Sequence, residues 1–467
     1  MAVRRERGSI DRVARQTLNN IDTAFLHLDD PTNLMIITGV MIFKSPIDFE
    51  RLTDTVEARL LSIARFRQRV VWPRLGRGNP YWEDDPDFDL RHHLQRATLP
   101  PPGGQAALQD AVSLLASTPL DLDKPLWQFH LIENYAECCA LVMRFHHCIA
   151  DGTSLIHVIL SLTDARPDAP WPAVPSRPST PSRQPRSPRF RPLERAVQEG
   201  YDLLSEPPRL AELKEAVQEA AGDLGRFLLL RPDPDTVLNG DLGVTKRAAW
   251  SEAVPLAEIQ TIRTRLGGTV NDVLVTVATG ALRRYMESRG DAVDQISIRA
   301  AVPVDVRTED AMRGLGNQVG AVFVTLPVSI ADPACRLSEI QRRMDQLKGS
   351  QEAPVFSFLL NALGMAPPQI ANTLISTFST RGSVVMTNVR GPKERRYLAG
   401  SPLDALLPWA PTTGRIGVAV SILSYAGEVR LGLLTDEGLV PDPEAILETF
   451  HTEFEALLTR ALKAEVQ

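Results

Sequence analysis

The stretch from Phe145 to Gly152 contains two adjacent histidines followed by an aspartate and a glycine. An imidazole titrates near neutral pH, so His146 or His147 could take a proton from an alcohol. Asp151 is close enough in sequence to orient a ring or anchor the loop, and Gly152 lets a substrate pass close by because it has no Cβ. We interpret this stretch as a general-base site. The alternative is a pair of core histidines before a turn-forming Asp-Gly.

Other chemistries fit these residues less well. Adjacent histidines on an extended segment point to opposite faces, so they cannot easily share one metal ion, and we expect no metal site. Cys148 is better explained as a small apolar loop residue than as a nucleophile. The chain has neither a G-x-S-x-G elbow nor a Walker loop, so serine hydrolase and P-loop chemistry are poorly supported.

The elements around the histidines predict a rigid setting for them. Residues 126–133 and 139–146 are strand candidates joined by a short polar link, which predicts a hairpin. Residues 153–162 form an apolar helical segment, and residues 33–43 predict another buried strand. The histidines therefore lie where a strand ends and a loop begins, a common place for active-site groups.

The rest of the chain alternates between helix and strand patterns, which predicts α/β layers in both halves. The strongest helical pattern covers 269–288, with one apolar face. Further helices are predicted at 51–70, 105–117, 336–348 and 443–463, and further strands at 296–304, 319–327, 383–389, 416–424 and 428–434.

Residues 166–192 hold nine prolines and no apolar periodicity, which predicts an extended linker. Residues 194–231 read as helical, with a break at the proline pair 207–208. We therefore expect an N-terminal domain over 1–165, a Pro-rich linker with connecting helices over 166–243, and a C-terminal domain over 244–467.

The composition sets outer limits. The length of 467 residues suggests two domains, and a 43% hydrophobic content is typical of a globular protein. The net charge of −6 gives no case for nucleic acid. The four cysteines have no disulfide-framework or zinc spacing, which favours a reducing, cytoplasmic setting. We expect no signal peptide, because the basic N-terminal residues lack an apolar stretch, and no apolar run is long enough to span a membrane. The sequence is compatible with peripheral contact at a membrane or lipid-droplet surface.

The histidine stretch resembles the HHxxxDG motif of the CoA-dependent acyltransferase superfamily. In that superfamily the second histidine is the base and the aspartate is mainly structural. The resemblance implies that His147 is the base, that Asp151 organises the loop, and that His146 supports it.

Other segments resemble one family within it, the wax ester synthases/diacylglycerol acyltransferases, over nearly the whole chain. Where that family usually has Pro, this chain has Arg390, which bears on the shape of one loop and not on the base. The matching segments are Asp22 with Phe25-Leu26, Pro125-Leu126-Trp127 with Leu131-Ile132, Val270-Asn271-Asp272-Val273, Pro303-Val304-Asp305-Val306-Arg307, Gly316-Asn317, Asn388-Val389-Arg390-Gly391-Pro392 and Ser424-Tyr425.

This resemblance implies two chloramphenicol-acetyltransferase-like domains, each a mixed sheet flanked by helices, with the active-site channel between them. Acyl-CoA would be a substrate and not a cofactor, and a fatty alcohol or diacylglycerol would be the acceptor. Gly152, Asn271 and Asp272 are candidate substrate-binding residues. Thr269 and Asp272 also fit a helix capping box, whereas Asn271 is a poor helix former that could donate its amide to a developing oxyanion. The apolar segment 355–376 is a candidate tunnel lining or membrane contact, or an ordinary pair of core helices.

Three alternatives remain at this point. His146 and Asp151 form an H-x4-D pair that resembles the glycerolipid acyltransferases acting on glycerol phosphate. The same fold could instead acylate a polyketide, an amine or a peptidyl carrier. A non-catalytic lipid-binding relative is the third. Which histidine is essential, and which acceptor is acylated, distinguishes these possibilities.

The linker composition yields a first prediction. A segment without a core has little structure to lose, so shortening 172–188 should leave activity largely intact, provided that the gap is still spanned. Turnover of the shortened protein, checked for fold by circular dichroism, tests this. A well-folded deletion without activity would show that the segment belongs to the site.

Overall fold

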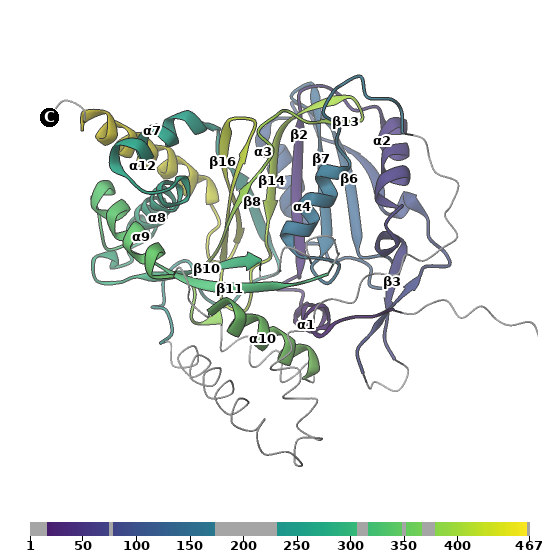
Figure 1. Cartoon of the computed structure of the whole chain (residues 1–467), viewed down its shortest axis with the longest axis horizontal. Coiled ribbons are helices and arrows are strands. Elements are labelled where there is room, and N and C mark those ends of the chain that lie inside the picture. The colour runs from purple at the N-terminus through teal and green to yellow at the C-terminus, as the bar shows by residue number, and fades with distance from the viewer. Residues whose placement is uncertain are drawn as a thin grey trace, which may run out of the picture.

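Two mixed sheets stand side by side in the computed structural model, each with helices packed against it (Figure 1). The structure describes residues 16–73, 78–172, 231–305, 316–347, 352–366 and 379–464. Most of the predicted linker and the helical segment after it lie outside these residues. The expectation of an α/β fold with two sheets flanked by helices is confirmed.

The sheet that carries the histidines is built around a hairpin. β6 (Trp127–Tyr135) and β7 (Cys138–His146) pair antiparallel, as predicted, and β2 (Ile36–Phe43) pairs with the other edge of β7. Both β2 and most of β7 are buried because the sheet is covered on its two faces. The strand order is β13-β14-β2-β7-β6-β5, with β5 at Leu94–Thr98, β13 at Tyr397–Leu398 and β14 at Ser401–Trp409.

The second sheet comes from the C-terminal half of the chain. Its strands run in the order β11-β10-β12-β15-β16-β8, and β9 also pairs with β16. Their bounds are β8 Lys246–Trp250, β9 Val254–Pro255, β10 Ile298–Asp305, β11 Val319–Leu326, β12 Val384–Arg390, β15 Val418–Tyr425 and β16 Glu428–Asp436.

Helices pack against both sheets (Figure 1). α4 covers the first sheet beside the histidines, while α8, α9, α7 and α12 cover the second. Their bounds are α1 Asn20–Leu28, α2 Phe49–Thr55, α3 Gln105–Ala116, α4 Gly152–Ser161, α7 Leu256–Leu266, α8 Val270–Ser288, α9 Pro333–Leu347, α10 Glu352–Met365 and α12 Pro443–Lys463.

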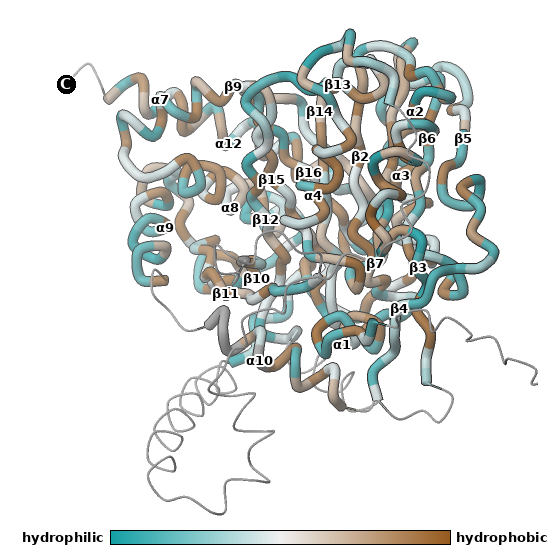
Figure 2. The backbone as a smooth tube through the Cα atoms, turned by 45° about the vertical axis from the view of Figure 1, so that its right-hand side comes forward, coloured by the Kyte–Doolittle hydropathy of each residue, from teal (hydrophilic) through white to brown (hydrophobic). Residues whose placement is uncertain are grey.

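The inner faces of the two sheets share one apolar cluster. Val40 and Leu407 of the first sheet lie in the same buried cluster as Ala419 and Leu434 of the second, together with Val112 of α3. Figure 2 shows the hydrophobic residues concentrated in the strands of both sheets. Burial of apolar area is the main favourable term in folding, so this cluster holds the two sheets together.

β14 is the main departure from the sequence analysis, which predicted no strand there. The strand follows β12 in the C-terminal half but pairs antiparallel with β2 of the first sheet, placing Pro408 opposite Gly39. The first sheet is therefore completed by the C-terminal half of the chain. β14 was missed because Pro402 and Pro408 suppress the strand pattern. The short β13 pairs only with Ser401 and Pro402, so beyond Pro402 the strand pairs with β2 alone, and a strand that is open on one side tolerates proline.

Most other predicted elements are confirmed to within a few residues, and α12 has the predicted bounds. The helix predicted over 51–70 is wrong in its second half. α2 continues into a π turn over Val56–Leu60, and Gln68–Val71 then form β3, which pairs with β4 (Tyr81–Asp84). Pairing with the nearby strand β4 overrides the local helical pattern in this region.

α10 covers the first part of the apolar segment 355–376, and residues 367–378 lie outside the described part of the chain. Leu360 and Leu363 of α10 are buried in the first core, and Gly364 touches the backbone of α1. This part of the segment therefore packs as a core helix against α1.

That close approach gives a second prediction. A Cβ at Gly364 would lie 1.7 Å from the carbonyl oxygen of Asn20, so Gly364→Ala must push α10 away from α1. Overpacking of this kind costs about 1–3 kcal/mol. Replacing Gly by Ala within a helix gains roughly 1 kcal/mol in helix propensity, so the cost exceeds the gain over most of its range. Urea unfolding should show a net loss of stability. Met365→Ala, at the exposed next position, should stay within about 0.5 kcal/mol of wild type.

Candidate active site

The loop after β7 is shaped by the start of α4. Asp151 is the N-cap of this helix, and its Oδ1 accepts a hydrogen bond from the backbone N–H of Ser154 at 2.9 Å. Its Oδ2 accepts from the backbone N–H of Gln318, at 3.3 Å, at the start of β11. Asp151 therefore anchors the histidine loop to both halves of the chain.

Two side chains hold the imidazole of His147, one on a face of the ring and the other at its edge. The ring of Phe25 stacks on it, with centroids 3.9 Å apart and planes 17° from parallel. Nδ1 of His147 lies 3.0 Å from Oδ1 of Asn317. The backbone N–H of His147 donates to the carbonyl of Met35 at 2.7 Å. Contacts from α1, β11 and the segment before β2 thus fix the position of the ring.

Burial is the largest influence on the protonation of His147. It lowers the pKa of His147 to about 4, because a charged imidazolium loses solvation there, while the negative charge of Asp151 opposes the shift. The ring is therefore neutral at neutral pH and free to accept a proton. The same low pKa makes it a weaker base, so a nearby negative charge would help once the ring becomes positive.

Asn317 and Asp22 form a buried polar pair behind His147. The side-chain amide of Asn317 donates to Oδ1 of Asp22 at 2.8 Å and to the carbonyl oxygen of His147 at 2.6 Å. Burial raises the pKa of Asp22 to about 6, although the charge of Arg65 and the bonds from Asn317 lower it. Both side chains come from segments that the sequence analysis matched to the family without assigning them a role.

His146 faces the opposite way from its neighbour. It is only 1% exposed, its Nδ1 accepts the backbone N–H of Cys148 at 3.1 Å, and its Nε2 lies 3.7 Å from Oδ1 of Asp29. His146 is the last residue of β7, so the alternation of side chains along an extended segment separates the two rings.

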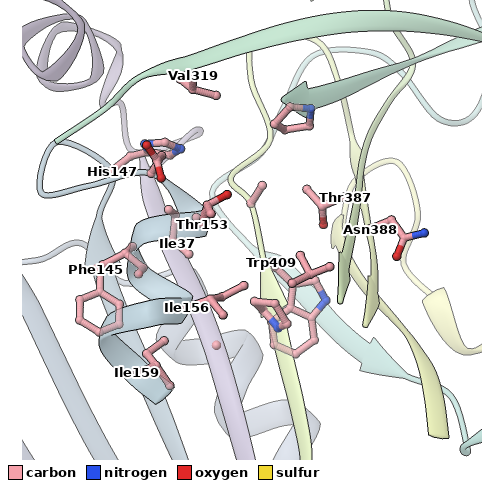
Figure 3. A pocket seen from close by; sticks show the side chains of 18 of the residues that line it. Ile37, Phe145, His147, Thr153, Ile156, Ile159, Val319, Thr387, Asn388 and Trp409 are labelled. Carbon is pink, nitrogen blue, oxygen red and sulfur yellow. The ribbon is translucent and has the colours of Figure 1, made fainter. Parts of the chain in front are cut away.

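A cavity of about 160 Å³ opens in front of His147, between α4 and the strands of both sheets (Figure 3). His147 and Thr153 lie at one end, with Ile156 and Ile159 farther along α4. The opposite side carries Thr387 and Asn388 of β12. The other lining residues are Ile37, Gly39, Phe145, Asp151, Gly152, Leu155, Pro303, Val304, Gln318, Val319, Val389, Leu406, Pro408, Trp409 and Ala410.

Of the three candidate substrate-binding residues, Gly152 borders this cavity, and a Cβ at that position would meet no atom within 4 Å. Asp272 completes a capping box with Thr269 at the start of α8. Asn271 accepts a hydrogen bond from the amide of Asn388 at 2.7 Å. The structure therefore brings His147, Asp151 and Gly152 together, whereas Asn271 reaches the cavity wall only through Asn388.

Phe25, Asn317 and Asp22 are the site residues that the sequence analysis did not assign. Their separation from His147 in the chain hides any local spacing signal, and the only available hint was the family resemblance of their segments. Within the described ranges, no group of three or more His, Cys, Asp or Glu side chains is arranged to hold a metal ion. Within the same ranges, no helix has the length and apolar character needed to cross a membrane.

Comparisons with known proteins identify the family of the chain. Residues 18–274 match the wax ester synthase/diacylglycerol acyltransferase catalytic domain, and residues 315–458 match the C-terminal domain of the same family. A Mycobacterium tuberculosis relative described as "Probable diacyglycerol O-acyltransferase tgs1" is 30% identical, over 91% of this chain and 92% of its own. Another from that species, "Probable diacyglycerol O-acyltransferase tgs2", is 28% identical over 91% and 95%.

Solved structures show the same fold. The wax ester synthase/diacylglycerol acyltransferase from Marinobacter aquaeolei VT8 is similar with a TM-score of 0.70 and 24% identity, over 96% of this chain and 99% of that one. The first condensation domain of the CDA synthetase gives 0.61 and 15%, over 96% of each chain.

The fold is the two-lobed chloramphenicol-acetyltransferase-like fold, and the site places a histidine of the HHxxxDG type at a cavity between the lobes. This fold and the HHxxxDG stretch define the chloramphenicol-acetyltransferase-like class of proteins. The chain belongs to the wax ester synthase/diacylglycerol acyltransferase family and is an acyltransferase of lipid metabolism.

The electrostatics of His147 yield a third prediction. With its pKa lowered to about 4, the imidazole of His147 loses its free electron pair only as the pH falls toward 4. Turnover should therefore hold from neutral pH to about pH 5 and be about half lost near pH 4. Asp151→Asn removes a negative charge that stabilises the protonated ring, so the acid limb should move to still lower pH.

Asparagine caps helices as well as aspartate does, so this substitution keeps the start of α4. Initial rates of ester formation between pH 3.5 and 8 measure the limb, and circular dichroism at each pH excludes acid unfolding. An acid limb near pH 6.5 that Asp151→Asn does not move would contradict the assignment.

Proposed function

We propose that this protein transfers a long-chain fatty acyl group from acyl-CoA to the hydroxyl of a lipid alcohol, diacylglycerol or a fatty alcohol, making triacylglycerol or wax ester. One observation carries the proposal: a neutral imidazole, His147, stands at the head of a cavity whose walls along α4 and β2 are apolar. A base needs a polar head, and a fatty chain needs apolar walls.

In the proposed reaction, the alcohol oxygen attacks the thioester carbonyl while His147 takes the hydroxyl proton. The tetrahedral intermediate then collapses, the carbon–sulfur bond breaks, and the proton passes from His147 to the leaving thiolate, which departs as CoA. No acyl group is held by the protein. Asp151, which orients the loop, would also stabilise the imidazolium that forms in this step.

Binding energy for the proposed substrates would come from apolar burial. Each methylene removed from water contributes roughly 0.8 kcal/mol, so even part of a fatty chain seated along Ile37, Ile156 and Ile159 would hold the reacting carbonyl in place. Gly152 would let the chain or the acceptor pass close to the start of α4. Asn271 would act at the rim through Asn388, with Asp272 keeping the start of α8 in place.

The proposed partners are acyl-CoA and a lipid alcohol. An alcohol of this kind resides in a lipid phase, so the proposal includes peripheral contact of the protein with a membrane or lipid-inclusion surface. The proposed location of the protein is the cytoplasm. Incubation of the purified protein with palmitoyl-CoA and a panel of fatty alcohol, diacylglycerol, fatty amine and glycerol phosphate tests the substrate assignment. Exclusive acylation of the amine or of glycerol phosphate would refute it.

The fourth prediction separates the two histidines. His147→Ala should cut turnover by about a hundredfold or more, because positioned general-base catalysis commonly contributes that much, while acyl-CoA binding survives. His146→Ala should mainly affect folding, since its ring is buried beside Asp29. Ester formation by each variant, normalised to the folded fraction, measures the difference. If His146 is essential and His147 is not, the H-x4-D mechanism is favoured. A fully active His147→Ala protein would refute the mechanism proposed here.

The fifth prediction concerns chain length. Gly39 of β2 lines the cavity, and a Cβ there would lie 3.6 Å from Cε of Met143, an ordinary contact. Gly39→Leu should therefore be accommodated at its Cβ but extend into the cavity. Preference among C8 to C18 substrates should move toward shorter chains, with little loss of turnover on the shortest.

The matched control is Gly104→Leu, at the exposed N-cap position just before α3, where a Cβ would meet no atom within 4 Å. Its chain-length profile should equal that of wild type. An unchanged profile in a folded Gly39→Leu protein would show that this end of the cavity does not receive the chain.

A further inference from the structure

We propose that Asn317 and Asp22 fix the tautomer of His147, so that Nδ1 carries the proton and Nε2 is the base. Both are positioning residues, because they act through the imidazole and not on the substrate. The inference rests on the proposed base role of His147 and identifies the atom that performs it.

The orientation of the Asn317 amide follows from its partners. Its Nδ2 lies 2.8 Å from Oδ1 of Asp22 and 2.6 Å from the carbonyl oxygen of His147, and neither oxygen can donate when the carboxyl is ionised. The amide nitrogen must therefore point at these two acceptors. Oδ1 then faces Nδ1 of His147 at 3.0 Å, and because a carbonyl oxygen only accepts, Nδ1 must be the donor.

A neutral imidazole carries one proton, so a protonated Nδ1 leaves Nε2 with the free electron pair. In the other tautomer, Oδ1 of Asn317 and Nδ1 of His147 would be two acceptors facing each other in a buried place. Asn317 is 2% exposed, so water cannot easily compensate for such a mismatch. The amide therefore selects one tautomer.

Asp22 prevents the side-chain amide of Asn317 from flipping by about 180°. It is 3% exposed and accepts both the backbone N–H and the side-chain amide of Asn317, at 3.2 and 2.8 Å. The charged group facing it is the Arg65 guanidinium, and the buried thiol of Cys148 is also close enough to feel its charge. A flipped amide would turn its oxygen toward this carboxylate, which is electrostatically unfavourable.

The same helix supports the ring from its other side. Asp22 and Phe25 are three residues apart on α1, so they lie on one face of the helix. Phe25 stacks on the imidazole while Asp22 holds the amide that meets its edge. α1 therefore sets both the plane and the protonation of the base, and β11 supplies the link between them.

The first test observes the tautomer directly. Side-chain ¹⁵N NMR of the histidine-labelled full-length protein, with His147 assigned by its loss in His147→Ala, should show Nδ1 protonated and Nε2 unprotonated at pH 7. In Asn317→Leu the ring should populate the other tautomer. kcat should fall about tenfold or more, as expected when a catalytic histidine loses the group that orients it, with KM for acyl-CoA unchanged.

Asn361→Leu is the matched control, because Asn361 also hydrogen-bonds α1, through Asn20 at 3.0 Å, without contacting His147. If Asn317 merely tethered α1, the two variants would behave alike. The control should keep the wild-type tautomer and kcat.

A double variant, Asp22→Asn with Asn317→Asp, exchanges the amide and the carboxylate. It should keep Nδ1 protonated and recover part of the lost kcat. It should also raise the pKa of His147, since a negative charge now joins that of Asp151 beside the ring, while burial and the charge of His146 still act to lower this pKa. An NMR titration measures this pKa.

The proposal is overturned if Nε2 carries the proton in the wild type, if Asn317→Leu keeps both the tautomer and kcat, or if the double variant leaves the pKa of His147 unchanged. The NMR measurements need no substrate. If the tautomer is as expected but no lipid ester forms, the proposed function fails and this inference stands.

Discussion

The clamp on the His147 ring is the constraint on which the rest of the site depends. Its ring is stacked on Phe25 and bonded to Asn317, and these residues come from α1 and the start of β11. A general base must lie within hydrogen-bond reach of the proton that it takes, roughly 2.6–3.2 Å between heavy atoms, and a misplacement of about 1 Å can cost on the order of a hundredfold in rate. Three segments far apart in the chain therefore have to meet at one imidazole, and the two-lobed architecture achieves this.

The shared core between the sheets makes that meeting rigid. β14 leaves the C-terminal half and completes the first sheet, so the lobes cannot separate without breaking strand pairs. Lys246 adds a polar tie: its Nζ lies 2.7 Å from the carboxylate of Asp436 and 2.8 Å from the carbonyl of Thr32. A buried ion pair contributes little net stability but is costly to disrupt, so it favours one arrangement of the lobes.

Burial has opposite consequences for the two titratable groups behind the cavity. It lowers the pKa of His147, which keeps this imidazole neutral. It raises the pKa of Asp22, so that the charged form of this carboxyl depends on hydrogen bonds from neighbouring donors. Asn317 lies between them and is neutral at every pH, so it transmits orientation without adding charge. An asparagine at this place keeps His147 neutral, whereas an aspartate would favour the imidazolium.

Much of this protein could be predicted from its sequence, because the relevant signals are local. The hairpin of β6 and β7, the helix after the histidines, the capping box at Thr269 and the alternation that separates His146 from His147 all follow from neighbouring residues. Residue periodicity and hydrogen-bonding capacity determine such features without reference to the rest of the chain.

Only the tertiary structure decided which distant residues complete the site. Asn317 is 170 positions from His147, and Asp22 is 295 positions from Asn317, so no spacing rule links them. β14 likewise forms its strand pairs with β2, more than 350 positions earlier in the chain, and its prolines hide the strand pattern in the local sequence. Hydrogen-bond partners and apolar contacts at long sequence separation exist only once the chain has folded, and in this protein they position His147.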